Sequence, residues 1–440
     1  MNSNNNNHST EIYNNFRQKA GEAGESVFVF HKYWSEGKIN GSRKLLGMFI
    51  QELQYLENFL DEAGARVNKK WFYFSELVAS MRNLSIVSYI LYHSLHRYDH
   101  YKIEEIENIS NDFTEEAAPV LDFINQSIKN LFKACIEEAK NLNISIKEGM
   151  TPKRKHLGMF SKEKLPADYE FNQMKGEKEK VLSLVRKLRK AAKMSKVECF
   201  GHKYSYDELM ELVPLKIDEK KARKLKNIVH AVQSDYDTYV KNTVLESENP
   251  KLREIRRISS IPLHLLEAAR WLSHFYERHE SNICSNNASD KLAELIDRKK
   301  VLDIVVNFLL YYSDYFLQKG NTLAEDIMSA YAEKVQYELS IPKPLGFHAR
   351  PSTYVSLIVN EHGTDVEMIV DSKRYNAKSV INLLMAAGYI SEKGYQKVTF
   401  EGDKRVLDDL KILSENNYCE DQKIPPELNY LRILRNMPSH

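Results

Sequence analysis

Apolar residues recur every three or four positions through most of the first 333 residues. One such stripe consists of Leu45, Phe49, Leu53, Leu56 and Leu60. Similar stripes run through residues 71–98, 120–139, 263–276 and 301–317. This spacing is typical of amphipathic helices that bury one face. Because glycine and proline are sparse in this region, the sequence predicts long helices joined by short loops, in a bundle or an irregular all-α body.

The helical periodicity is interrupted between residues 149 and 175. A basic run, TPKRK, stands at residues 151–155, and Pro166 follows in the same stretch. We therefore expect two helical domains, at residues 11–150 and 151–333, the second with a basic segment. The asparagine-rich residues 1–10 are expected to be disordered.

The pattern changes to short alternating runs after residue 333. Val335, Tyr337 and Leu339 alternate with polar residues, as do Val366, Met368 and Val370, which is typical of half-buried strands. Shorter strands are expected at residues 374–376 and 398–400. Apolar residues at helical spacing predict three helices in this region. The first runs from residue 351 to Gly363, the second from residue 379 to about residue 387, and the third spans residues 406–413. The predicted fold class is α+β, a mainly helical N-terminal region followed by a βαββαβα unit whose antiparallel sheet carries helices on one face.

A candidate chemical site lies where the first of these helices begins. The sequence reads GFHARP at residues 346–351 and places His348 directly before the helix. Pro351 fits a first helical turn, since the N–H group it lacks would be unpaired there. Free helix-start amides attract anions, and Arg350 adds a guanidinium. The segment could therefore hold a phosphoryl group on the imidazole of His348, without a metal or another cofactor.

Two motifs in order, GFHARP and NAKSVI at residues 376–381, resemble the histidine-containing phosphocarrier protein (HPr) family of the bacterial phosphotransferase system. The resemblance spans residues 334–418 and implies an open-faced β-sandwich. It implies that His348 accepts a phosphoryl group from phosphorylated enzyme I and passes it to an enzyme IIA-type acceptor, with Arg350 stabilising the phosphate. It also implies partner docking at four residues: Phe347, Val380, Ile381 and Leu384.

Ser379 stands at the place of the family's regulatory serine. The resemblance implies phosphorylation there by an HPr kinase/phosphorylase, whereas the residues alone predict only a helix N-cap. A phosphate would add roughly two negative charges beside the docking residues. Both interpretations of Ser379 remain open at this point.

The chain departs from the family in two respects. The spacing between Ser379 and Gly394 is longer than usual, with residues 388–391 carrying the excess, and Asn382 stands where small residues are frequent. HPr is normally a small free protein, whereas here the resemblance covers the C-terminal fifth of a 440-residue chain. A tail at residues 419–440 is expected to form a short helix that packs back onto the protein.

Composition and charge restrict the remaining possibilities. With 42% hydrophobic and 28% charged residues, no apolar run long enough to span a membrane and no secretory leader, the sequence predicts a cytoplasmic protein. Four scattered cysteines fit reduced thiols. Residues 151–226 carry 21 Lys and Arg against 11 Asp and Glu, a net of +10. Since aromatic residues are few in this basic region, a solvated helix face is favoured over nucleic-acid binding.

Two histidine groups have a spacing that metal ligands can show. His93, His96 and His100 fall on one side of a predicted helix, and His274 lies near Glu277 and His279 on another. Nothing in the sequence brings the two helices face to face, so hydrogen-bonded histidines are the favoured interpretation and no metal is predicted.

The sequence thus favours a phosphoryl-group carrier of the phosphotransferase system, serving sugar uptake, rather than an enzyme that turns over by itself. The alternative is a regulatory adaptor, in which the HPr-like domain signals its phosphorylation state through the helical region. The intact pair His348 and Arg350 favours transfer, and the enlarged chain favours regulation.

Overall fold

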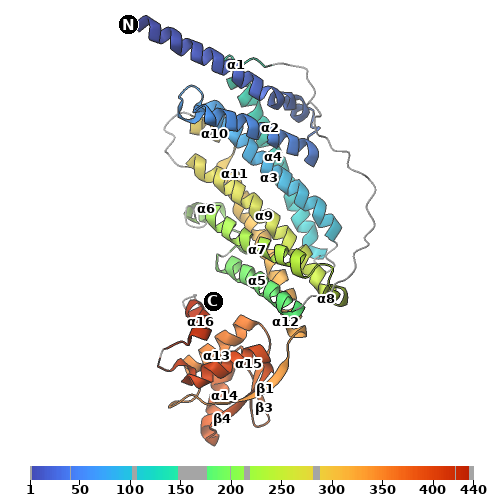
Figure 1. The fold of residues 1–440 in the computed structure, drawn as a ribbon, viewed down its shortest axis with the longest axis vertical. Helices are drawn as coiled ribbons and strands as arrows, with labels where there is room; N and C mark the ends of the chain where they lie inside the picture. The colour runs from blue at the N-terminus through green and yellow to red at the C-terminus, as the bar shows by residue number, and fades with distance from the viewer. Residues whose placement is uncertain are drawn as a thin grey trace.

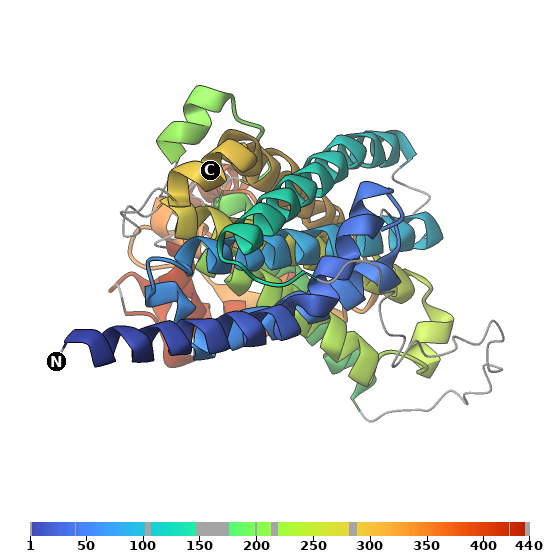
Figure 2. The same ribbon diagram turned by 90° about the horizontal axis from the view of Figure 1, so that it is seen from above.

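The computed structural model describes residues 2–39, 41–101, 107–146, 176–198, 200–212, 219–280, 288–421 and 423–435. The described chain is mostly helical and consists of a helical body, from Asn2 to Ala330, and a C-terminal domain, from Lys334 to Arg435. Figure 1 shows the body above the C-terminal domain along the long axis of the molecule. Seen from above, the helices of the body cover most of the C-terminal domain (Figure 2).

The helical body contains helices α1 to α12 and two short segments, the 3₁₀ helix η1 and the π-helix η3. Their bounds are α1 Asn2–Ser35, α2 Arg43–Glu62, η1 Ala65–Val67, α3 Phe72–Tyr101, α4 Glu107–Asn141, α5 Glu177–Val197, α6 Tyr206–Leu212, α7 Glu219–Tyr239, α8 Val244–Glu248, α9 Lys251–Glu280, α10 Ala288–Leu295, α11 Arg298–Asp303, η3 Ile304–Leu310 and α12 Tyr311–Ala330. Helix α1 includes residues 2–10, for which disorder was expected.

Helix α2 illustrates how the apolar stripes produce this body. The hydroxyl of Ser42 accepts a hydrogen bond from the Leu45 amide at 3.3 Å and so caps the helix start. The stripe residues Phe49, Leu53, Leu56 and Leu60 are fully buried. Since one side of α2 is covered in this way, its stability comes mainly from packing against α1 and α3.

The buried apolar side chains of the body form one continuous cluster, which extends from Ala20 to Met328. The predicted break at residues 149–175 lies outside the described residues, which end at residue 146 and resume at residue 176. None of the described helices has the length and apolar character needed to cross a membrane.

The C-terminal domain contains a four-stranded antiparallel sheet with strand order β1-β4-β2-β3. Its elements are β1 Lys334–Ser340, α13 Ala349–His362, β2 Val366–Val370, β3 Lys373–Asn376, α14 Val380–Lys393, β4 Lys397–Asp403 and α15 Lys404–Glu415. Strand β1 pairs with β4 so that Tyr337 lies opposite Phe400. Helix α13 follows β1 along the chain, α14 lies between β3 and β4, and α15 follows β4.

The two faces of the sheet differ in character. Val366, Met368 and Phe400 are buried on the face that α14 and α15 cover. On the other face, Arg374 pairs with Glu367 at 2.5 Å and with Glu401 at 2.7 Å. The alternation of apolar and charged residues along each strand thus leaves one face open to water.

Helix α14 is longer than the sequence analysis expected. It continues past Gly388 to Lys393 and ends at Gly394, whose φ of +69° closes the helix. Buried Ile390 anchors the added turn, and the hydroxyl of Tyr389 donates to a carboxylate oxygen of Asp371 at 2.9 Å. Packing of this turn overrides the weak helix propensity of Gly388.

The residues after α15 pack on the C-terminal domain. Tyr418, Cys419, Leu428 and Leu431 are fully buried in its core. The short helices of this tail are η4 Asn417–Cys419, η5 Pro426–Leu428 and α16 Tyr430–Arg435. Since α16 contacts α13, the tail covers part of the helix that begins at His348.

Candidate phosphoryl-acceptor site at the start of α13

His348 is the N-cap residue of α13. The turn before it uses Gly346 at φ +68°, and the Gly346 amide donates to the Pro342 carbonyl at 2.9 Å. His348 has an extended backbone, and its side chain makes no capping hydrogen bond. The first helical bond runs from the Ser352 amide to the His348 carbonyl at 3.1 Å, so the amides of Ala349 and Arg350 have no partner in the helix.

The structure brings His348 and Arg350 together around Glu420, which sequence analysis did not identify. Nε2 of His348 lies 3.1 Å from a carboxylate oxygen of Glu420, although the two atoms are not aligned for a hydrogen bond. The Arg350 guanidinium donates to the Glu420 carbonyl at 3.0 Å and lies 3.9 Å from the other carboxylate oxygen. Glu420 is 15% exposed, whereas His348 and Arg350 are 34% and 41% exposed.

This arrangement already holds an anion beside the histidine. The Glu420 carboxylate lies next to the imidazole that would accept the phosphoryl group and 3.9 Å from the Arg350 guanidinium that would neutralise it. Because the imidazole and guanidinium stay partly exposed, a partner protein can reach them. An acidic residue in the tail gave no signal in the sequence, because only the folding of the tail brings it to α13.

Ser379 is the N-cap residue of α14. Its hydroxyl accepts a hydrogen bond from the Asn382 amide at 3.3 Å, and its side chain is partly buried. The structure thus accounts for Ser379 as a cap. A phosphate on this hydroxyl would face the free amides of the same helix start.

Three apolar side chains of α14 are exposed, while a predicted docking residue is not. Ile381 is 70%, Met385 64% and Leu384 40% exposed, and Val380 is partly buried. Phe347 does not belong to this surface. It is only 3% exposed because its ring packs edge-on against Phe400 and Tyr418, so it is a core residue.

The opposite end of α13 is bound to the helical body. The guanidinium of Arg189 on α5 donates to the Glu361 carbonyl at 2.8 Å and to the Asn360 carbonyl at 3.0 Å. Lys193 pairs with the Glu361 carboxylate at 2.8 Å. Arg189 thus satisfies two carbonyls that a helix end leaves unpaired, and Lys193 adds a side-chain ion pair beside them.

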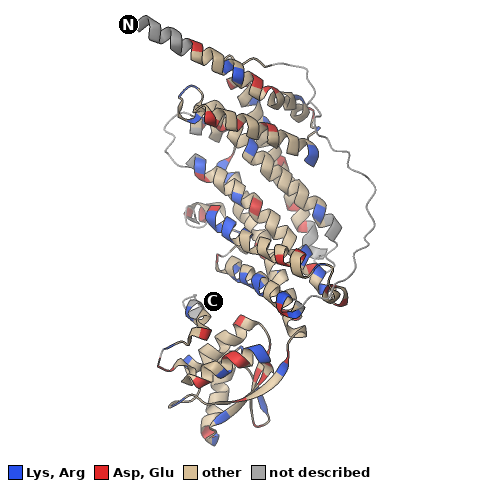
Figure 3. Ribbon diagram, in the orientation of Figure 1, with Lys and Arg blue, Asp and Glu red and all other residues tan. Residues whose placement is uncertain are grey.

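Gly363 makes this close approach possible. Its φ is +77°, and a Cβ atom at this position would lie 2.2 Å from Nη1 of Arg189. Any side chain would therefore displace Arg189 from the helix end. Part of the predicted basic helix on α5 is thus an internal contact with the C-terminal domain, and Figure 3 shows the Lys and Arg positions along α5 beside that domain.

The histidine groups have partners other than metal ions. Nδ1 of His274 lies 3.0 Å from the Glu219 carboxylate, and the Glu277 carboxylate accepts from the Glu219 amide at 2.8 Å. Nδ1 of His93 lies 2.6 Å from Nη1 of Arg43. Within the described ranges, no group of three or more His, Cys, Asp or Glu is arranged to hold a metal ion. The side chains of His100 and His279 lie outside the description.

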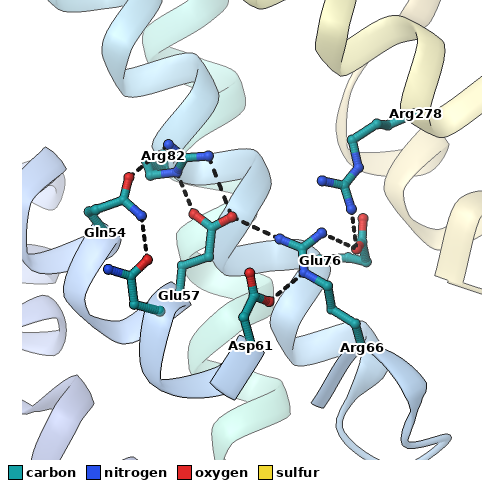
Figure 4. Close-up of polar contacts among 8 residues, drawn as sticks. Gln54, Glu57, Asp61, Arg66, Glu76, Arg82 and Arg278 are labelled. Atoms are coloured by element: carbon teal, nitrogen blue, oxygen red, sulfur yellow. Dashed lines mark hydrogen bonds and ion pairs between the residues drawn. The ribbon is translucent and has the colours of Figure 1, made fainter. Parts of the chain in front are cut away.

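A buried ionic network joins α2, α3 and α9 in the helical body (Figure 4). The Glu57 carboxylate accepts from Arg66 at 2.8 Å and also pairs with Arg82. Glu76 lies 3.8 Å from Arg66 and 3.5 Å from Arg278, and burial raises the pKa of Glu76. Asp61 also pairs with Arg66, so three carboxylates balance three guanidinium groups, and we assign the network a structural role.

One region of the chain, within the C-terminal domain, matches a known protein family. Residues 335–408 match the family described as "PTS HPr component phosphorylation site". The match confirms the resemblance of the C-terminal domain and covers none of the helical body. A search of curated proteins found no match, and neither did a search of solved structures.

Proposed function

We propose a phosphocarrier function, on the premise that residues 335–408 form a domain of the PTS HPr family. In this proposal His348 accepts a phosphoryl group from phosphorylated enzyme I and passes it to an enzyme IIA-type or regulatory acceptor in the cytoplasm. The observation that carries the proposal is the partly exposed imidazole at the N-cap of α13, with Arg350 beside it.

The proposed reaction is reversible transfer between two nitrogen atoms. A nitrogen lone pair of the His348 imidazole attacks phosphorus, the new P–N bond forms, and the P–N bond to enzyme I breaks. The Arg350 guanidinium and the helix-start amides then neutralise the phosphoryl charge. The Glu420 carboxylate has to move away from His348 and Arg350, because it would otherwise compete with the phosphoryl group for the Arg350 guanidinium.

The test uses the whole chain, enzyme I and labelled phosphoenolpyruvate. We expect label on the chain that is labile in acid, stable in base and located by mass spectrometry on the peptide that contains His348. Label at a serine, or no label on a chain with native circular dichroism, would contradict the proposal.

Modification of Ser379 is proposed as the control of this transfer. The Ser379→Asp chain keeps an N-cap but places a negative charge next to exposed Ile381 and partly buried Val380. We expect enzyme I to label it at least about tenfold more slowly, which corresponds to roughly 1.4 kcal/mol of lost docking free energy. The measurement is the initial rate of labelling.

The Ser379→Asn chain is the matched control, since asparagine caps a helix without adding charge. Its rate should remain close to that of the unmodified chain. If Ser379→Asp and Ser379→Asn are labelled equally fast, charge at this position does not control docking.

A second candidate function is a regulatory adaptor, and the contact between Arg189 and α13 favours it. The same helix carries His348 at its start and is held by the helical body at its end. Phosphorylation of His348 is expected to change amide hydrogen exchange in α5. The Arg189→Met chain should lose this change, because methionine fills the buried site but cannot donate to the carbonyls.

Lys190→Met is the matched control for Arg189→Met, since Lys190 is the exposed neighbour on α5. After phosphorylation of His348, the Lys190→Met chain should still show the change in amide hydrogen exchange in α5. If exchange in α5 is the same before and after phosphorylation of the unmodified chain, the adaptor function is excluded and simple transfer remains.

A further inference from the structure

The helical body contains a pocket of about 500 Å³ that the phosphocarrier function does not use. Residues of α3, α7, α8 and α9 line it, together with Lys241 from the connection after α7. The pocket lies apart from His348, which belongs to the C-terminal domain. Its size falls within the range of small-molecule sites.

Cationic side chains predominate around the pocket. Its charged lining comprises five cations and two carboxylates, a net of +3: Arg97, Lys241, Arg253, Arg256 and Arg257, with Asp237 and Glu246. Two of the arginines are paired. Arg256 donates to both oxygens of Asp237, at 3.1 and 3.2 Å, and Arg253 lies 3.6 Å from Glu246.

The other three cations are available to a ligand. Arg97, Lys241 and Arg257 are exposed and form no ion pair with another residue in the described part of the chain. This distinguishes the pocket from the balanced network around Glu57, where carboxylates and guanidinium groups are equal in number. Unpaired cations on the wall of a concave site attract and concentrate anions.

A buried donor provides independent evidence that the pocket is built for a ligand. Gln233 lines the pocket and is only 8% exposed, and its side-chain amide nitrogen makes no hydrogen bond with the described residues. An unpaired buried donor costs free energy unless a partner binds it. An acceptor oxygen of a ligand would satisfy this amide.

Two histidines of the pocket wall, His93 and His264, have pKa values that nearby arginines help to lower. Their rings stack edge to face, with centroids of His93 and His264 4.7 Å apart. Burial, together with His93, Arg256 and Arg97, lowers the pKa of His264 to about 4. Burial and Arg43 also lower the pKa of His93, so both histidines are neutral near pH 7 and do not add to the net charge of +3.

We propose that this pocket binds a small molecule that carries two phosphate groups. Three unpaired cations match the charge of a diphosphate, and the amide of Gln233 supplies a neutral donor to one of its oxygens. The concave shape favours a small molecule over nucleic acid, whose backbone needs an extended basic surface. This ligand site is an addition to the phosphocarrier function and does not depend on it.

The position of the pocket connects it with the C-terminal domain. Gln233 and Asp237 belong to α7, which packs against α5 and is tied to it by the ion pair between Asp235 and Lys187. Helix α5 also carries Arg189, which holds the end of α13. Helix α7, which lines the pocket, therefore packs directly against α5, and α5 contacts the C-terminal domain.

The test is isothermal titration of the full chain with inorganic pyrophosphate in buffered 0.15 M salt, without magnesium. We expect saturable binding with one site per chain. The Arg257→Gln and Lys241→Gln chains should each bind roughly tenfold more weakly, because each loses a charge-assisted hydrogen bond. The Gln233→Leu chain should also bind more weakly and keep its net charge.

Lys224→Gln is the matched control, since Lys224 is exposed on α7 and does not line the pocket. Its affinity should equal that of the unmodified chain. Equal weakening by Lys224→Gln and Lys241→Gln would show general attraction to a basic surface and would overturn the proposal. Absence of saturable heat would also overturn it. Lys241 is exposed and lies outside the regular helices, so its variant tests the site even if Arg257→Gln does not fold.

Discussion

The His348→Ala chain is expected to carry no acid-labile phosphate after incubation with enzyme I and labelled phosphoenolpyruvate. The imidazole is the only nucleophile that the structure places between Arg350, Glu420 and the first amides of α13, as far as the described residues show. Alanine keeps the backbone but has no lone pair that can attack phosphorus. The measurement is the amount of base-stable label per chain, with circular dichroism to show that the fold is retained.

His362→Ala is the matched control because His362 lies at the other end of α13. Its Nε2 atom is 2.8 Å from an Asp409 carboxylate oxygen, so its loss removes an internal contact and leaves the start of the helix unchanged. This chain should be labelled to the same extent as the unmodified protein. Persistent acid-labile label on His348→Ala would place the acceptor elsewhere and refute the assignment.

The second large effect is expected in the helical body. Replacing Glu57 by alanine should lower its free energy of unfolding by about 3 kcal/mol, since removing one partner of a buried ion pair leaves the other charge uncompensated. Glu57 is 4% exposed, and its loss deprives both Arg66 and Arg82 of a carboxylate. The variant should unfold at a lower urea concentration.

Tryptophan fluorescence measures this effect selectively. The three tryptophans, Trp34, Trp71 and Trp271, all belong to the helical body, so the C-terminal domain does not contribute to the signal. Glu62→Ala is the control, because Glu62 lies on the same helix but is exposed. Loss of less than about 1 kcal/mol in Glu57→Ala would show that the network behaves like an ordinary surface ion pair.

Much of the fold followed from local patterns. The stripe on α2 and the alternation in β2 each identified their buried face, because burial repeats at the period of the backbone. Gly363 and Ser379 marked helix ends whose geometry requires such residues. Helix α14 was predicted too short, since its last turn depends on a contact between Tyr389 and Asp371 that is distant in sequence.

The site was predicted only in part, for a related reason. His348 and Arg350 are two residues apart, so their proximity is a property of local sequence. Glu420 and Arg189 reach α13 from segments 70 and 171 or more residues away along the chain. Such contacts depend on tertiary packing, for which a single sequence gives no periodic signal. The docking role expected for Phe347 does not fit its burial in the core, because an aromatic residue beside a functional motif suits docking and core packing equally well.

The length of α13 determines how phosphorylation at its start could affect the contact at its other end. A helix of 14 residues is about 21 Å long at 1.5 Å per residue, whereas charges are screened beyond about 8 Å at physiological salt. A phosphoryl group at His348 would therefore exert little direct electrostatic force on Arg189. Coupling between the two ends would therefore require α13 to tilt or slide as a rigid body.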